Sequence, residues 1–460
     1  MLALALLAIA PLRFHFDASE FTNTVYQVSC LTGRVLCTNS VYDKFWNSAY
    51  QVTEADGVQL RAWRDTVKKF EAAAPDPPSA ALLPNYAGFY PSLVARNRIV
   101  TTAIESGSAA EFRKRAAKLV GEADATRLSE ILNHFERRLH PWWVSFGRRA
   151  VEGHIHDVKQ RMKTSGLLPL ADQVAAFVDA HLETRDVYVH AVPSPLPRSG
   201  DASATVVSNH FFVEILASDK PDYTIWKAMH ELTHAFYDSA PLERHRSLMG
   251  QFVAAGEPRS PVFYSFLNEA LATAVQLLVY ERQGLKDDDP YHDPYIPRLA
   301  RATVPLLKEA LANHGTLFDG FAGQYLRAGT AELGEQVSNP NFILATAAVL
   351  ASGNNQKAYD AFMDRFHPRF FLTLEKEWKL FGELSAVRLI TYDELAGYAS
   401  EIPNMNSLMK GRGFAFVAPY GTRSSVFFLA GRDAEAASDV ARQLSKLPSV
   451  PAQGLIFAVN

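Results

Sequence analysis

The chain has 460 residues, of which 48% are hydrophobic, and a formal net charge of −3 at pH 7. This length allows a large buried core and suggests two to three domains, or one catalytic unit with large helical additions. Acidic and basic residues are interspersed, and no basic stripe or arginine-rich tail occurs. The composition therefore argues against nucleic acid as a partner.

The N-terminal segment Met1–Leu12 is almost entirely apolar and contains Ala8-Ile9-Ala10, a small-residue pattern typical of a secretory cleavage site. It is too short to span a bilayer alone, so no stable membrane span is expected. We expect a signal peptide and export to the periplasm or the medium. Because no lysine or arginine precedes the apolar run and Pro11 would follow the cut, the alternative is a misassigned start and a cytoplasmic protein.

The two cysteines, Cys30 and Cys37, follow this segment closely. In an oxidising compartment they could close a small loop, whereas in the cytosol they would be free thiols. A third alternative is a thiolate that caps a metal before activation.

Helical spacing of apolar residues predicts helices within Val41–Phe70 and Ala109–Ser165, separated by the proline-rich link Ala74–Pro91. His154-Ile155-His156 lies in the second region. The two imidazoles of this tripeptide diverge on a helix, so we expect an exposed polar face rather than a metal site.

The next segments indicate a small sheet. Arg185–Val192 and Thr205–Leu216 are rich in valine, phenylalanine and tyrosine with partial alternation, which predicts strands. Pro193–Gly200 between them is rich in turn-forming residues. We expect the following helix to pack behind these strands.

That helix is predicted over Tyr223–Asp238, with Ile225, Met229, Leu232 and Phe236 as its core-facing stripe. Its start is indicated by Pro221, with Ser218 or Asp219 as the capping residue, and Pro241 should end it.

The helix carries His230-Glu231-Leu232-Thr233-His234, an H-E-x-x-H motif. Residues four apart lie one turn above each other, so both imidazoles can bind one metal ion while Glu231 faces a bound water. Catalytic zinc has three protein ligands and an open position. Glu269 is the best third ligand, because it is the only acid in the apolar run Phe263–Tyr280, where an unpaired carboxylate would be costly.

The H-E-x-x-H motif followed by Asn268-Glu269 and Ala272 on a second helix resembles the gluzincin zinc metallopeptidases. The resemblance covers about a fifth of the chain, from about Asp186 to Glu281. It implies that His230, His234 and Glu269 bind Zn²⁺ and that Glu231 is the general base.

Two features depart from that family. The gap between His234 and Glu269 leaves room for an extra helix through Leu242–Ala254. Thermolysin-like members also place an aspartate four residues after the glutamate ligand to orient a histidine. This chain has Thr273 there, so its hydroxyl or another acid such as Asp238 would have to serve.

The resemblance also implies a sheet edge strand that binds an extended peptide beside the metal. Ser208-Asn209-His210 lies on the strand best placed for that groove, although ordinary strand polarity is the favoured explanation for these three residues. A donor for the developing oxyanion is usually a later tyrosine or histidine. Tyr264, His314 and Tyr325 are unranked candidates.

After the acidic, proline-rich loop Leu285–Pro297, the segment from Tyr295 to Tyr398 is predicted to be helical. The C-terminal part changes character and predicts a small β-β-α-β unit. Its expected elements are strands at Phe414–Pro419 and Ser425–Ala430, a helix at Ala434–Leu447 and a strand at Gly454–Val459.

These elements predict a predominantly helical α+β protein with a zincin-like catalytic core. The expected divisions are an N-terminal or signal segment at 1–40, a helical region at 41–170, the catalytic core at 171–284, a second helical region at 285–410 and an α/β unit at 411–460.

The expected function is a zinc-dependent hydrolase, most reasonably a metallopeptidase with a peptide or protein substrate. The alternatives are a hydrolase of a non-peptide amide and a non-catalytic binding protein with a vestigial zinc site. A structural zinc site would need a fourth protein ligand, and no cysteine lies near the motif. The sequence leaves open endo- versus exopeptidase action, substrate preference and oligomeric state.

Overall fold

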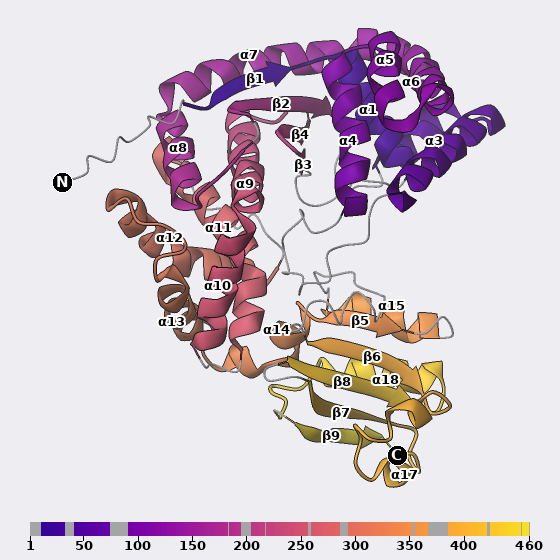
Figure 1. Ribbon diagram of the computed structural model, residues 1–460, viewed down its shortest axis with the longest axis vertical. Coiled ribbons are helices and arrows are strands. Elements are labelled where there is room, and N and C mark those ends of the chain that lie inside the picture. Colours follow the sequence, from indigo (N-terminus) through magenta and orange to yellow (C-terminus); the bar gives the residue numbers. More distant parts are fainter. Residues whose placement is uncertain are drawn as a thin grey trace.

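The computed structural model describes residues 11–32, 41–73, 91–182, 184–194, 204–216, 218–255, 259–285, 293–351, 355–366, 385–420, 424–451 and 453–459. The fold is mostly helical with two small mixed sheets (Figure 1), which confirms the predicted α+β class. Residues 74–90 of the predicted link Ala74–Pro91, residues 1–10 and Cys37 lie outside the described residues, and Pro91 begins a helix.

The N-terminal helices form one lobe with its own hydrophobic core (Figure 1). They are α1 (Glu20–Leu31), α2 (Val41–Phe45), α3 (Glu54–Ala72), α4 (Pro91–Ser106), α5 (Ala109–Val120) and α6 (Glu122–Trp142), with π-helical turns at Trp46–Tyr50 and Trp143–Gly147. Thr53 and Asp56 form a reciprocal capping box at the start of α3. We call these helices the N-terminal lobe.

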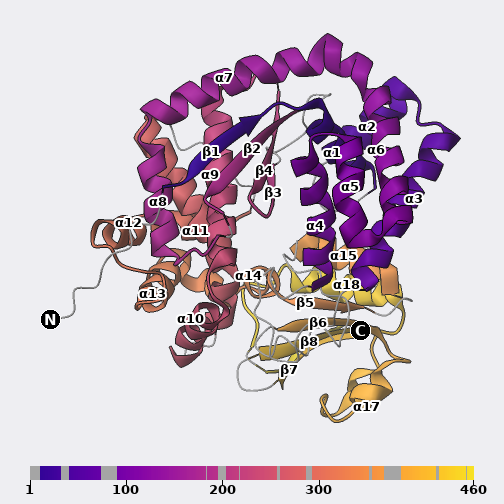
Figure 2. The same ribbon diagram turned by 45° about the horizontal axis from the view of Figure 1, so that its top comes forward.

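The first sheet lies between this lobe and the helices that follow (Figure 2). Its strands are β1 (Arg13–Asp17), β2 (Asp186–Pro193), β3 (Ala204–Val207) and β4 (His210–Ile215), in the order β1-β2-β4-β3. β1, β2 and β4 are parallel, and β3 pairs with β4 in the antiparallel sense. Strand β1 was not predicted.

The two faces of this sheet carry different side chains because successive residues of a strand point to opposite faces. One face, which includes Val187, Val189 and Phe211, belongs to the main core with α7 (Arg148–Thr164), α8 (Leu167–Phe177) and the helix after β4. The other face places Val192 and Phe212 in the core of the N-terminal lobe.

The predicted single strand over Thr205–Leu216 is wrong, because this segment is a hairpin. Ser208 and Asn209 form the two-residue turn between β3 and β4, and Ser208 has a positive φ of 57°. The polar residues of the turn therefore lie at the end of the hairpin and not along a strand, and only His210 belongs to β4.

The helix with the H-E-x-x-H motif is α9 (Pro221–Ser239), followed by α10 (Leu242–Ala254). All four residues of the predicted stripe of α9 are buried, and Pro241 immediately precedes α10, as predicted. The predicted cap is wrong: Lys220 is the N-cap without a side-chain bond, and the Asp219 carboxylate accepts a hydrogen bond from the Leu216 amide at 2.7 Å.

Helix α11 (Ser260–Gln283) packs on α9 and on α12 (Ile296–Ala312). It is long and apolar enough to cross a membrane, but 83% of its most apolar window is buried in the protein. That burial is typical of a core helix. α13 (Phe321–Leu333), a 3₁₀ turn at Gly334–Ser338 and α14 (Pro340–Leu344) follow.

A second, five-stranded sheet forms the C-terminal part. Its strands are β5 (Ala348–Ala351), β6 (Ala386–Thr391), β7 (Gly413–Tyr420), β8 (Ser424–Gly431) and β9 (Gly454–Val459), in the order β5-β6-β8-β7-β9. Helices α15 (Gln356–Phe366) and α18 (Ala434–Leu444) share its hydrophobic cluster. The short elements Leu395–Tyr398 and α17 (Met405–Leu408) precede β7.

This sheet corrects two predictions. The segment from Tyr295 to Tyr398 is not helical throughout, because it contains β5 and β6. The C-terminal β-β-α-β elements are present, but they are not a separate unit, because β8 pairs with β6 in parallel. The apolar strand β6 is buried and has no strict alternation, which makes it hard to distinguish from a buried helix by sequence.

Candidate metal centre

Helices α9 and α11 bring His230, His234 and Glu269 together. Nε2 of His234 lies 3.2 Å from Nε2 of His230. The Glu269 carboxylate lies 3.8 Å from Nε2 of His230 and 3.7 Å from Nε2 of His234. Among the described residues, this is the only group in which three such ligand atoms lie within 4.8 Å of one another.

The spacing of these atoms fits a tetrahedral ion. Two ligand atoms at about 2.0–2.1 Å from such an ion lie about 3.3 Å apart. The separation of the two imidazole nitrogens matches this value, and the carboxylate needs only a small movement. Two imidazoles and one carboxylate form a donor set that zinc accepts, and it leaves a fourth position without a protein ligand.

Burial of these three side chains costs free energy when no metal ion is bound to them. The side chains of His230 and His234 are 7% and 15% exposed, and that of Glu269 is 27% exposed. The site therefore opens to solvent mainly on the carboxylate side. Partly buried polar groups with converging lone pairs are stabilised by a cation.

The orientation of His234 is set by Asn268, the residue before Glu269. Nδ1 of His234 donates to Oδ1 of Asn268 at 2.9 Å, which leaves Nε2 as the nitrogen that faces Glu269. A hydrogen bond of this kind selects the tautomer that a metal requires. Thr273 and Asp238 were expected in such a role from the sequence, whereas Asn268, which adjoins the third candidate ligand, was not.

The surroundings of the candidate site shift the pKa values of Glu231 and His234. Burial raises the pKa of Glu231; the nearby His234 opposes this shift and the Glu269 carboxylate adds to it. Burial lowers the pKa of His234, but the carboxylates of Glu269 and Glu231 outweigh it and the net shift is upward. A raised pKa suits a carboxylate that must accept a proton and later return it.

Of the remaining residues considered for this site, Asp238 interacts electrostatically with His234. Thr273 is buried on α11, and burial raises the pKa of Asp238 to about 7. Tyr264 and Tyr325 are buried, with ring centroids 5.4 and 6.1 Å from that of Phe252, and His314 is exposed after α12.

The structure also bears on two predictions outside this site, those for His154 and for Cys30. His154 is half-buried rather than on an exposed face, and its Nε2 lies 2.6 Å from the Thr224 hydroxyl of α9. Cys30 is buried on α1 and is disulfide-bonded, which excludes the free-thiol and metal-capping alternatives for this residue.

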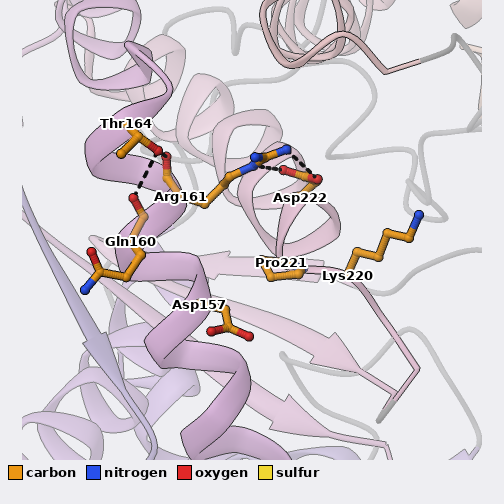
Figure 3. Close-up of a pocket in the computed structure, with 7 residues that line it drawn as sticks. All are labelled: Asp157, Gln160, Arg161, Thr164, Lys220, Pro221 and Asp222. Atoms are coloured by element: carbon orange, nitrogen blue, oxygen red, sulfur yellow. Dashed lines mark hydrogen bonds and ion pairs between the residues drawn. The ribbon is translucent and has the colours of Figure 1, made fainter.

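The start of α9 is held against α7 by an ion pair. Arg161 donates to both carboxylate oxygens of Asp222, at 2.8 and 3.2 Å (Figure 3). A pocket of about 400 Å³ lies beside this pair and is lined by Asp157, Gln160, Arg161, Thr164, Lys220, Pro221 and Asp222. Because its charged groups are exposed or already paired, we regard it as part of the packing between α7 and α9.

No family model, curated protein or solved structure matches the chain. The geometry of the candidate site is therefore the basis for its interpretation.

Proposed function

We propose that this protein is a zinc-dependent hydrolase, most reasonably a metallopeptidase with a zincin-like core. One observation carries the proposal: His230, His234 and Glu269 converge from two helices while Glu231 lies on the same helix turn as the histidines. A purely structural zinc site would need another protein ligand, and the described residues offer none within the cluster.

The chemistry would be divided between the ion and Glu231. Zinc at this site would polarise a carbonyl and lower the pKa of a bound water. Glu231 would accept the proton from the attacking water and transfer it to the leaving amine. Asn268 would hold the His234 ring in place during these steps.

A peptide substrate is favoured over other amides by the hairpin next to α9. Strand β3 is at the edge of the first sheet and contacts α9. An edge strand offers backbone donors and acceptors to an extended chain, so a peptide could bind beside the metal. A non-peptide amide remains the second candidate substrate, because the metal centre itself does not discriminate between amides.

The disulfide at Cys30 supports export. Disulfides persist in oxidising compartments and are rare in the cytosol. We therefore propose a periplasmic or secreted protein.

The decisive experiment compares two acids of α11. Glu269→Ala should reduce zinc content from about one ion per chain and weaken zinc in competition with a chelator, because a ligand is lost. Glu281→Ala is the matched control, since Glu281 pairs with Lys308 at 2.6 Å on the surface. Equal zinc retention in both variants would remove Glu269 from the site, and absence of zinc from the wild type would overturn the proposal.

Activity must be tested separately. Hydrolysis of peptide libraries and of small acyl amides by the zinc-loaded protein would distinguish the two substrate classes. A zinc-loaded wild type that cleaves neither class would favour the non-catalytic alternative.

A further inference from the structure

The face of the first sheet that points toward the N-terminal lobe carries a buried pair of histidines. Nε2 of His190 on β2 lies 2.9 Å from Nδ1 of His210 on β4. The side chains are 3% and 2% exposed. Two imidazoles that share a hydrogen bond in the interior are a proton-sensitive contact, because one ring must donate and the other must accept.

A carboxylate lies at the outer end of each ring. Nδ1 of His190 is 3.2 Å from Oδ2 of Asp17 on β1, and Nε2 of His210 is 3.7 Å from Oε1 of Glu105 on α4. We call Asp17, His190, His210 and Glu105 the histidine relay. It connects three strands of the sheet with a helix of the N-terminal lobe.

The relay also reaches α1. The Thr22 hydroxyl of α1 donates to Oδ2 of Asp17 at 3.1 Å. A cavity of about 490 Å³ borders the relay on its lobe side. The contact between sheet and lobe at this point therefore depends on polar groups as well as on packing.

The carboxylates determine the direction of the hydrogen bonds. Ionised Asp17 can only accept, so Nδ1 of His190 donates to it. If His190 is neutral, its Nε2 accepts, and Nδ1 of His210 must donate. The bond between the rings is lost only when Nε2 of His190 and Nδ1 of His210 both carry a proton, because neither nitrogen can then accept.

The pKa shifts of the individual groups agree with these hydrogen-bond directions. Burial lowers the pKa of His190, and this outweighs the opposing effect of Asp17. Burial raises the pKa of Asp17, but the hydrogen bonds from His190, Thr22 and the Ser19 backbone oppose it and the net shift is downward, so Asp17 stays ionised. The proximity of His210 lowers the pKa of Glu105.

Other titratable and charged groups surround the relay. They are His15 on β1, Asp186 and Tyr188 on β2, Arg115 on α5, and, farther along β4, Glu214 with Tyr26 of α1. His15 and Arg13 are both paired with Asp186, and Tyr26 donates to Glu214 at 2.7 Å. Arg115 lies 3.9 Å from Glu105.

The relay does not have the arrangement of a metal site. Among the described residues, only the cluster of His230, His234 and Glu269 brings three candidate ligand atoms within 4.8 Å. The facing nitrogens of the relay have a proton between them and carboxylates on their far sides, so proton uptake is the chemistry that the geometry supports.

We propose that the histidine relay is a proton-operated latch, closed while at least one of its two imidazoles is neutral and released when both are cationic. Release breaks the bond between the rings and places two cations side by side in the interior. It thereby separates α1 and α4 from the sheet while the rest of the fold persists. This latch does not depend on the proposed hydrolase activity.

Hydrogen exchange of the full-length protein tests the latch. Exchange would be followed by mass spectrometry at pH 7.5, 6.5 and 5.5 and corrected for the intrinsic rate. Below pH 6.5 the opening equilibrium constant for peptides of α1 and α4 should rise about tenfold per pH unit, because opening then takes up one proton. Peptides of α12, which is remote from the relay, should show no such rise.

Three variants identify the sensor. In His190→Gln the amide can accept from His210 and donate to Asp17 but cannot take up a proton, so the rise should disappear. His156→Gln changes an exposed histidine of α7 and should behave like the wild type. In Glu105→Gln the closed pair of rings loses the carboxylate that compensates an added proton, so opening takes up more protons and the rise should steepen, up to about a hundredfold per pH unit.

Each outcome decides the proposal. The proposal is overturned if α1 and α4 of the wild type lose no more protection from hydrogen exchange on acidification than α12. It is also overturned if the His190→Gln variant keeps the acid response. If His190→Gln does not fold, Glu105→Gln decides, because Glu105 is half-exposed and its replacement should be tolerated. An unchanged slope in that variant would show that the relay is not the sensor.

Discussion

Oδ1 of Asn268 lies 2.9 Å from Nδ1 of His234, so the residue next to one candidate ligand orients another. The bond joins α11 to α9 at the point where Glu269 faces both histidines. The ligand and its orienting group therefore come from a single turn of α11.

The first prediction concerns this hydrogen bond. Asn268→Ala should weaken zinc binding about 10- to 100-fold, because the His234 ring loses the partner that fixes its tautomer. Asn268→Asp should retain most of the affinity, and Asn313→Ala, at the exposed end of α12, is the control. Chelator competition provides the measurement. Wild-type affinity in Asn268→Ala would show that packing alone holds His234.

The second prediction concerns Glu231. Glu231→Gln should keep zinc and fold but lower turnover by about 10²- to 10⁴-fold, since an amide cannot accept the proton of the attacking water. Glu243→Gln, on the exposed side of α10, should leave turnover unchanged. Rates would be measured on the best substrate found for the wild type. A variant as active as the wild type would contradict the assigned role.

The third prediction concerns acid stability. His245 is fully buried against the rings of Tyr237 and Phe318, and burial lowers its pKa to about 4. The unfolded chain, with an ordinary value of about 6.5, binds more protons between these two pH values, so stability falls as pH drops through this window. His245→Phe should remove on the order of 3 kcal/mol of this loss.

Urea unfolding at pH 7 and pH 4 gives the free energy of unfolding of the variant and of the wild type. The loss between the two pH values is then compared between the two proteins. His314→Asn is the control, because His314 is exposed and asparagine tolerates its positive φ of 53°. If His245→Phe loses as much stability on acidification as the wild type, His245 is not the group that takes up the proton.

The fourth prediction compares two glycines of α13. A Cβ at Gly329 would lie 2.7 Å from Phe263 of α11 and 3.0 Å from Leu299 of α12, so Gly329→Ala should cost about 1–3 kcal/mol. A Cβ at Gly323 meets only Arg327, at 3.5 Å, so Gly323→Ala should gain about 0.5 kcal/mol from helix propensity. Thermal unfolding of the two variants provides the test. Effects of the same sign would show that α13 does not approach its neighbours this closely.

Local patterns determined much of what could be predicted. The stripe from Ile225 to Phe236 and the two prolines that border α9 specify that helix through side-chain spacing and backbone geometry, and the structure has it within two residues of the prediction. The extra helix α10 has the predicted bounds, Leu242–Ala254, and that prediction came from the long gap between His234 and Glu269. The H-E-x-x-H spacing likewise places two imidazoles on one helix face without any tertiary information.

Only the tertiary structure decided the relationships between distant segments. The contact of Asn268 with His234 depends on how α11 crosses α9, and β5 and β6 become strands through pairing with partners far along the chain. The relay joins Asp17 to His190 across 173 residues. Its side chains meet because the parallel register places Asp17 opposite His190, and a shift by one residue would turn them to the other face.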